Sequence, residues 1–171
     1  TSGTTGNPKG VVYHHRGGYL MATGSVTAWN MPNRLNFLYT VPMFHCNGWC
    51  YPWTLAMLHA RVICIRNIRA KEIFSLISEH KITHFGGAPI ILNMLANAPK
   101  EDQKKLEHKV YVLTAAAPPP SIIFKKMKEL GFEVMHVYGL TETYGHILQC
   151  AWNSNWNNLN EDEKADISSR Q

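Results

Sequence analysis

Residues 61–87 read RVICIRNIRAKEIFSLISEHKITHFGG and contain, in order, a strand pattern, a helix pattern and a second strand pattern. Residues 61–65 are rich in β-branched side chains, which favour strands. Residues 70–81 carry apolar side chains at the three- and four-residue spacing of a helix, and residues 83–86 are expected as a short strand that ends at a glycine pair. A strand, a helix and a strand joined by short connections predict a parallel β-α-β unit with a right-handed crossover.

The same alternation continues on both sides of this unit. We expect further strands over residues 36–41, 110–115 and 133–138, and helices over 48–60, 89–97 and 121–130. Beyond Trp152 the chain turns polar, which indicates a surface excursion with a short helix. The expected fold class is therefore α/β, with alternating βαβ units and a mainly parallel sheet.

Ligands of such sheets bind beyond the carboxyl ends of the strands, and this rule selects the segments to inspect. One of them, residues 1–10, precedes the strand-like stretch Val11–Val12–Tyr13. The other four follow expected strands and have unusual composition: residues 42–49, 86–89, 114–120 and 139–145.

The composition indicates one ordinary domain with a real core, since the 171 residues are 45% hydrophobic and 17% charged. A formal charge of +5 is typical of nucleic-acid binding, but the basic residues are scattered. The densest clusters, Lys104–Lys105 and residues 125–128, fall in helix patterns, so we expect solvated helix faces and no nucleic-acid partner. An anionic small ligand also suits a basic chain.

Four cysteines and the absence of a signal-peptide pattern favour reduced thiols in the cytoplasm. The cysteines are too few for a disulfide scaffold. No apolar run is long enough to predict a transmembrane segment. The first residue is Thr1, and the ligand-binding pattern starts there at once, so both ends look cut.

Residues 1–10, TSGTTGNPKG, combine three glycines, four hydroxyl side chains and Lys9. Glycines let backbone N–H groups face an anion, hydroxyls donate further hydrogen bonds, and Lys9 adds a positive charge. This pattern predicts a polyphosphate-binding loop. A flexible Ser/Thr/Gly linker is the alternative, although a linker would not need Pro-Lys-Gly before a strand-like run. The loop is not that of P-loop NTPases, because Lys9 lies between Pro8 and Gly10.

TSGTTGNPKG resembles the phosphate-binding signature of the adenylate-forming superfamily, which comprises acyl-CoA synthetases, luciferases and the adenylation domains of peptide synthetases. Residues 138–145, YGLTETYG, are similar to a second signature of that superfamily. Between them, residues 114–120, TAAAPPP, are similar to its adenine-site loop. The resemblance covers nearly the whole chain. It implies that residues 1–171 are an internal fragment of the AMP-binding N-terminal domain, with the C-terminal domain outside this sequence.

The resemblance also implies roles for individual residues. Glu142 would bind Mg²⁺, and Thr141 would bind the α-phosphate; a solvated loop carboxylate is the alternative for Glu142. Together with Lys9, these two form the expected catalytic set. Tyr138 would stack on the adenine, and many relatives have a glycine near Ala116. The cofactor-binding residues implied by the resemblance are Thr1, Ser2, Gly3, Thr4, Thr5, Gly6, Lys9, Ala115, Ala116, Ala117, Pro118, Tyr138, Gly139 and Thr141.

Residues 42–49, PMFHCNGW, resemble the segment that borders the acyl site in this superfamily. His45 would lie where acyl group and nucleotide meet, Trp49 would wall the acyl pocket, and Gly87 and Pro89 would border the acyl chain. A core histidine and a core tryptophan are the alternatives, as is a zinc site of His45 with Cys46 and Cys50, whose spacing lacks the paired CxxC pattern. The segment has no acidic residue to pair with an ammonium group, which disfavours an amino acid substrate.

These resemblances imply an acid–thiol ligase that uses ATP, Mg²⁺ and CoA to convert a carboxylic acid into an acyl-AMP and then an acyl-CoA. The fragment alone would be inactive. Residues 45–53 and the end of the chain are similar to ligases of short- and medium-chain acids, including 3-methylmercaptopropionate. A non-catalytic nucleotide-binding module and a free-standing βαβ interaction domain are the alternatives. In the latter, the three motif loops would lie apart.

Overall fold

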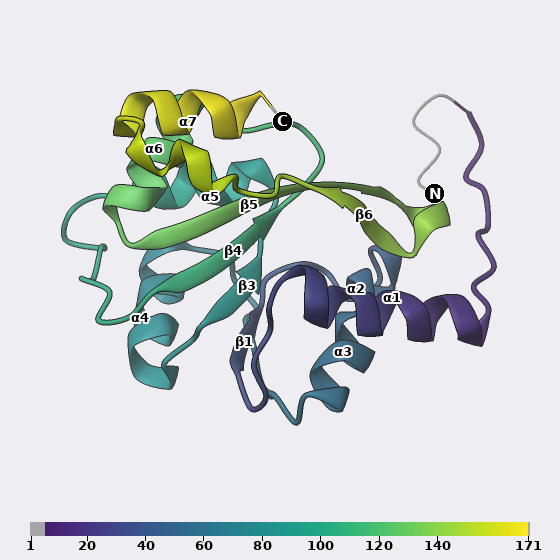
Figure 1. Cartoon of the computed structure of the whole chain (residues 1–171). Coiled ribbons are helices and arrows are strands. Elements are labelled where there is room, and N and C mark those ends of the chain that lie inside the picture. Colours follow the sequence, from purple (N-terminus) through teal and green to yellow (C-terminus); the bar gives the residue numbers. More distant parts are fainter. Residues whose placement is uncertain (1–5, 171) are drawn as a thin grey trace.

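A computed structural model describes residues 6–170, and its centre is a six-stranded sheet in the order β2-β1-β3-β4-β5-β6 (Figure 1). The first five strands pair in parallel, and β6 pairs antiparallel with β5. The expected α/β class with a mainly parallel sheet is confirmed. The strands are β1 Asn36–Tyr39, β2 Arg61–Cys64, β3 His84–Gly86, β4 Val110–Thr114, β5 Phe132–Leu140 and β6 Gly145–Gln149.

Helices connect the strands and cover both faces of the sheet (Figure 1). One face packs against α4, α5 and α6 through fully buried side chains such as Phe74, Leu95 and Met127. The other packs against α3 and the end of α1 through Trp29 and Leu55. The helices are α1 His15–Ala28, α2 Cys46–Trp49, α3 Tyr51–Met57, α4 Ala70–His80, α5 Pro89–Ala96, α6 Ser121–Glu129 and α7 Glu161–Ser169, with short 3-10 turns η1 Thr141–Thr143 and η2 Ser154–Asn158.

The order of the strands reverses at β1, which lies between β2 and β3. The connection from β1 to β2 runs through α3 on one face, and the connection from β2 to β3 runs through α4 on the other. The carboxyl ends of β1 and β3 therefore form a topological switch point, the place where open α/β sheets bind ligands.

Two sequence expectations about elements are wrong. Residues Val11–Tyr13 form no strand, and Val12 is 92% exposed, because the segment runs along the surface without pairing to any described strand. The helix expected over 48–60 begins only at Tyr51. Before it, the backbone from Cys46 to Cys50 has positive φ angles and turns left-handed, which apolar spacing alone does not reveal.

Two elements were not expected from the sequence: α1 and β6. The pattern of α1 is blurred by glycines, and only Ala22 and Ser25 are buried within it. β6 is buried at Gly145 and His146 and exposed over its last three residues, and its polar and apolar residues do not alternate cleanly. The short helix expected beyond Trp152 is present as α7, which begins with a capping box formed by Asn160 and Glu163.

Candidate functional site

The turn after β5 is the point at which the motif segments meet. β5 ends at Leu140, the 3-10 turn Thr141–Thr143 follows, and β6 returns from Gly145. The hydroxyl of Thr143 accepts a hydrogen bond from the Leu140 amide at 2.9 Å and donates to the Gly145 carbonyl at 2.7 Å. These bonds hold the turn that presents Thr141 and Glu142.

Two other parts of the chain contact this turn. The Tyr13 hydroxyl donates to the Thr141 carbonyl at 2.6 Å. From the α2 segment, the Cys46 thiol lies 3.4 Å from the Thr141 hydroxyl, and the Cys50 thiol donates to the Tyr144 carbonyl at 3.3 Å. The chain that follows residues 1–10 and the chain around His45 thus meet at one turn.

Burial raises the pKa of two groups beside this turn. Desolvation raises the pKa of Tyr13 to about 12, and desolvation followed by the nearby Cys46 raises the pKa of Cys50 to about 11. Both remain protonated donors at neutral pH. Glu142 is exposed on the turn, as a carboxylate that meets a solvated ligand would be.

The expected adenine-site residues lie at the same end of the sheet. Thr114, the last residue of β4, pairs with His136 of β5, so the loop after β4 and the end of β5 are neighbours. Ala115 packs against the core, whereas residues 116–118 are exposed. Tyr138 is 51% exposed. Gly139 pairs with His146 across the β5–β6 hairpin.

The phosphate-loop motif is described only in part. Thr1, Ser2, Gly3, Thr4 and Thr5 lie outside the described residues. Gly6 and Lys9 are on an exposed stretch that runs toward Tyr13.

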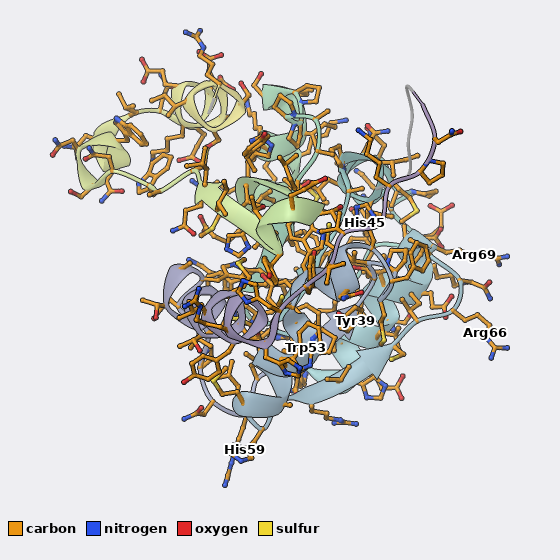
Figure 2. All side chains as sticks on the ribbon, turned by 90° about the vertical axis from the view of Figure 1, so that its right-hand side faces the viewer. Tyr39, His45, Trp53, His59, Arg66 and Arg69 are labelled. Atoms are coloured by element: carbon orange, nitrogen blue, oxygen red, sulfur yellow. The ribbon has the colours of Figure 1, made fainter. Side chains whose placement is uncertain are left out.

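The expected acyl-side residues lie on the segments that follow β1 and β3, and Trp49 also lies beside His146 of β6, with ring centroids 6.4 Å apart. The Thr40 hydroxyl donates to the Gly86 carbonyl and so bridges the two strand ends. Gly87 is buried and donates to the Leu113 carbonyl at 2.8 Å, and Pro89 begins α5. His45 is exposed beyond the end of β1, on the opposite side of Tyr39 from His59 (Figure 2).

The left-handed turn over Cys46–Cys50 sets the direction of Trp49. The backbone of Gly48 has a φ of 63° and its carbonyl accepts a hydrogen bond from the Tyr39 hydroxyl at 2.9 Å. A Cβ at Gly48 would lie 2.1 Å from that hydroxyl, so the position requires glycine. Trp49 is half-buried against the α1/α3 core, and its Nε1 is buried without a hydrogen-bond partner among the described residues.

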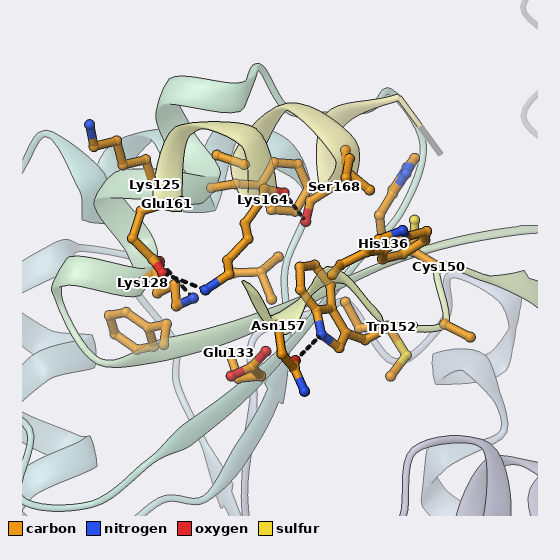
Figure 3. Close-up of a pocket in the computed structure, with 18 of the residues that line it drawn as sticks. Lys125, Lys128, Glu133, His136, Cys150, Trp152, Asn157, Glu161, Lys164 and Ser168 are labelled. Atoms are coloured by element: carbon orange, nitrogen blue, oxygen red, sulfur yellow. Dashed lines mark hydrogen bonds and ion pairs between the residues drawn. The ribbon is translucent and has the colours of Figure 1, made fainter. Parts of the chain in front are cut away.

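A cavity of about 430 Å³ lies elsewhere, between β5, α6 and α7 (Figure 3). Trp152 and Trp156 pack edge to face at 5.3 Å on one side of it. Its charged rim is paired, since Glu161 binds both Lys128 and Lys164. None of the motif residues discussed above lines this cavity, so we assign the candidate site to the strand ends and not to the larger hollow.

Among residues 6–170, no three His, Cys, Asp or Glu side chains are grouped as a metal site. The donors on the Thr141–Glu142 turn nevertheless fit Mg²⁺, because Mg²⁺ is commonly held by one or two carboxylates together with substrate phosphates. Carboxylate and hydroxyl oxygens are the hard donors that this ion prefers. Glu142, with Thr141 beside it, could therefore hold Mg²⁺ when a nucleotide is bound.

Sequence reasoning missed Tyr13, Cys50 and Tyr144, which build the surroundings of the turn. Tyr144 lies inside the YGLTETYG motif and Cys50 directly follows PMFHCNGW, so the motifs contained these residues without showing what they contact.

The mainly parallel sheet, with motif segments 42–49, 86–89, 114–120 and 139–145 at the carboxyl ends of its strands, fits an adenylate-forming α/β domain. The comparison with protein families agrees: residues 1–169 match the model described as AMP-binding enzyme. The chain belongs to this family.

Several curated relatives are named as CoA ligases. The chain is 52% identical, over its full length, to a protein of Arabidopsis thaliana named acetate/butyrate–CoA ligase and described as peroxisomal. It is 47% identical over its full length to a 2-methylpropanoate–CoA ligase of Humulus lupulus. The chain spans 30% of the length of each.

Solved structures give the same fold. The inhibitor-bound N-terminal domain of FACL13 from Mycobacterium tuberculosis superposes with a TM-score of 0.81 at 31% identity, over 87% of this chain and 37% of that one. The O-succinylbenzoate CoA synthetase of Bacillus subtilis, in complex with ATP and magnesium, has a TM-score of 0.80 at 24% identity, over 92% of this chain and 32% of that one. The latter likeness concerns the fold alone.

Within the described residues, no helix has the length and apolar character needed to cross a membrane. The cytoplasmic location expected from the sequence stays a prediction, because the Arabidopsis relative is described as peroxisomal.

Proposed function

We propose that the complete protein is an acyl-CoA synthetase that joins a carboxylic acid to the α-phosphate of ATP and then transfers the acyl group to CoA. The observation that carries the proposal is the meeting of separate motif segments at the Thr141–Tyr144 turn, through Tyr13 and through Cys46 and Cys50. Family membership and relatives named as CoA ligases support it.

The first step brings an anionic carboxylate to an anionic phosphate. A carboxylate oxygen attacks the α-phosphorus, the bond to the β-phosphate oxygen breaks, and pyrophosphate leaves. The chain would lower the barrier by neutralising charge: Lys9 and the loop amides at the triphosphate, and the Thr141 hydroxyl at the α-phosphate. Glu142 would hold Mg²⁺, which supplies positive charge to the phosphate oxygens.

In the second step, the CoA sulfur attacks the acyl carbon and AMP leaves. We assign the acyl side to the switch point between β1 and β3, because His45 and Trp49 lie on the segment that follows β1, and Gly87 and Pro89 on the segment that follows β3. In this proposal, residues 1–171 are an internal part of the N-terminal domain, and the whole enzyme includes a C-terminal domain that the fragment lacks.

We also propose that the acid is a short- or medium-chain fatty acid or 3-methylmercaptopropionate. The lack of an acidic side chain in residues 42–49 and the acetate, butyrate and 2-methylpropanoate in the names of the relatives support small uncharged acyl groups.

Pyrophosphate release by the complete protein, measured with ATP, Mg²⁺ and a panel of carboxylic acids, tests the proposal. We expect release that depends on the acid and an acyl-CoA product once CoA is added. Nucleotide binding without release on any acid would support the non-catalytic nucleotide-binding module instead.

A further inference from the structure

Tyr144 occupies an unusual backbone position at the end of the Thr141–Thr143 turn. Its φ of 68° is left-handed, a conformation that costs a non-glycine residue energy. Glycine would adopt it more cheaply, but glycine has no ring. Strained residues of this kind persist where the surrounding structure holds them and are common at functional sites. The contacts of the Tyr144 side chain show what holds it.

The Tyr144 side chain contacts the segment that follows the phosphate-loop motif. It stacks on the Tyr13 ring, with centroids 4.1 Å apart and an angle of 26° between the planes. Its hydroxyl accepts a hydrogen bond from the His14 amide at 3.0 Å. In return, the Tyr13 hydroxyl donates to the Thr141 carbonyl at 2.6 Å. The segment and the turn thus each contribute one tyrosine side chain that binds the other.

Gly17 leaves the space that the Tyr144 ring fills. A Cβ built at Gly17 would lie 2.4 Å from Cζ of Tyr144 and 2.6 Å from its hydroxyl oxygen. The neighbouring Gly18, in the same helix α1, has nothing within 4 Å of such a Cβ. The first turn of α1 is therefore shaped to accept the ring at one glycine and not at the next.

We infer that Tyr144 is a positioning residue for the nucleotide: with Tyr13, His14 and Gly17, it clamps the chain downstream of the phosphate-loop motif onto the turn that carries Thr141 and Glu142. We call this set the tyrosine clamp. The clamp acts through Thr141, whose carbonyl it holds, and through residues 6–10, whose downstream anchor it forms. The inference rests on the proposed function, because it assigns the clamp's effect to ATP.

The clamp explains why two motifs that are far apart in the sequence act on one triphosphate. Residues 6–10 end four residues before the clamped His14, and Thr141 lies three residues before Tyr144. Fixing both segments at this point sets their mutual position before the nucleotide binds. Such preorganisation lowers the entropy cost of ordering the segments on binding. Loss of the clamp should therefore weaken the use of MgATP and leave recognition of the acid unchanged.

Replacing Gly17 by Ala in the complete protein tests the clamp, with Gly18→Ala as the matched control. Gly18→Ala should retain or raise the melting temperature, because alanine favours a helix over glycine. In Gly17→Ala this gain is offset by the lost stacking and hydrogen bond of Tyr144, so its melting temperature should change by only a few degrees. Only Gly17→Ala forces the Tyr144 ring out. We expect Gly17→Ala to raise the KM for MgATP about tenfold, as the loss of a stacked pair and a hydrogen bond would. The KM for the acid should change less than twofold in both variants.

Tyr144→Phe adds a graded measurement, since it keeps the stacked ring and removes the hydroxyl that accepts from His14. Its KM for MgATP should fall between those of the unmodified protein and Gly17→Ala. Binding of a non-hydrolysable ATP analogue with Mg²⁺ should show the same order. Equal nucleotide affinity in Gly17→Ala and Gly18→Ala would overturn the clamp while leaving the proposed function intact. An unmodified protein that neither binds the analogue nor releases pyrophosphate would overturn both.

Discussion

The face of the sheet covered by α4, α5 and α6 and the rim at the carboxyl ends of the strands use the backbone in different ways. On the covered face, α4 buries Ile73, Phe74 and Ile77 completely within regular helix geometry. At the rim, the non-glycine residues with positive φ are Cys46, Asn47, Trp49, Cys50, Ala116 and Tyr144. Apart from Lys81, which ends α4 with a φ of 52°, the helices of the first region hold conformations that their residues prefer, whereas the conformations at the rim must be imposed by the rest of the molecule.

The imposed conformations have a cost and identifiable supports. A left-handed non-glycine residue costs roughly 1–2 kcal/mol. At Cys46–Cys50 the support is the bond from Tyr39 to the Gly48 carbonyl together with the full burial of Cys50. At Tyr144 the support is the tyrosine clamp. The packed faces of the sheet stabilise the fold, whereas the rim lowers its stability because residues there hold strained conformations that place the ligand-binding groups.

Glu142→Gln gives the largest expected effect and should impair catalysis at the rim without changing the stability of the packed sheet. Glutamine keeps the shape of the side chain but loses the charge that holds a hard cation. In the complete protein, we expect pyrophosphate release to fall on the order of 10²-fold or more, with no change in melting temperature. Glu129→Gln, an exposed carboxylate at the end of α6, is the control and should change neither. Unchanged release in Glu142→Gln would remove the residue from the metal role.

The free energy of unfolding should depend on pH through His84, a buried residue of β3. Burial lowers the pKa of His84 to about 4, below its unfolded value of 6.5. Between pH 4 and pH 6.5 the unfolded chain is protonated at His84 and the folded chain is not. The free energy of unfolding is therefore unaffected by His84 above pH 6.5 and decreases as the pH falls toward 4. At pH 5 we expect a loss of about 2 kcal/mol from this group.

Denaturant unfolding at pH 7 and pH 5 measures this loss. His146, whose pKa is also lowered by burial, acts in the same direction. The His84 ring stacks on the Tyr111 ring, with centroids 5.0 Å apart, and His84→Phe retains a ring at this position. This variant should lose less stability on acidification than the unmodified chain. An equal loss in the two proteins would show that His84 does not carry the effect.

Trp49 tests whether the rim selects the acid. If Trp49 walls the acyl pocket, Trp49→Leu opens space, and longer acids gain relative to shorter ones by about 0.8 kcal/mol per buried methylene, a few-fold each. The measurement is the ratio of kcat/KM for a six-carbon and a three-carbon acid in the complete protein.

The packing of Trp49 against the α1/α3 core supplies the alternative outcome. As a core residue, Trp49→Leu would lower stability by about 2–4 kcal/mol and reduce activity on all acids alike. An unchanged ratio together with a lower melting temperature would withdraw Trp49 from the acyl site.

Ala116→Gly gives the smallest expected effect and tests the cost of the rim directly. Ala116 has a φ of 79°, and glycine adopts this conformation without the clash of a Cβ. We expect a gain of roughly 0.5–1 kcal/mol, or about 2–4 °C in melting temperature. The neighbouring Ala115→Gly, without a positive φ to relieve, should lower stability instead. A drop in both variants would show that the loop is not strained at Ala116.

The local pattern of the sequence determined the scaffold and the segments that line the site. Apolar spacing located α4, α5 and α6, and short apolar or β-branched runs located β1, β2 and β4, to within two residues. The glycine- and hydroxyl-rich motifs identified the ligand segments and the family. These features are visible because each depends on residues that are neighbours in the chain.

Only the tertiary structure decided how the rim is built. Tyr13 and Thr141 are 128 residues apart, and Cys46 and Thr141 are 95 apart, yet both pairs are in contact. The left-handed turn at Cys46–Cys50 and the position of Tyr144 oppose local preference and exist only because such distant contacts hold them. Local sequence patterns record what each segment prefers by itself; conformations imposed by partners far along the chain become visible only when those partners have been brought together.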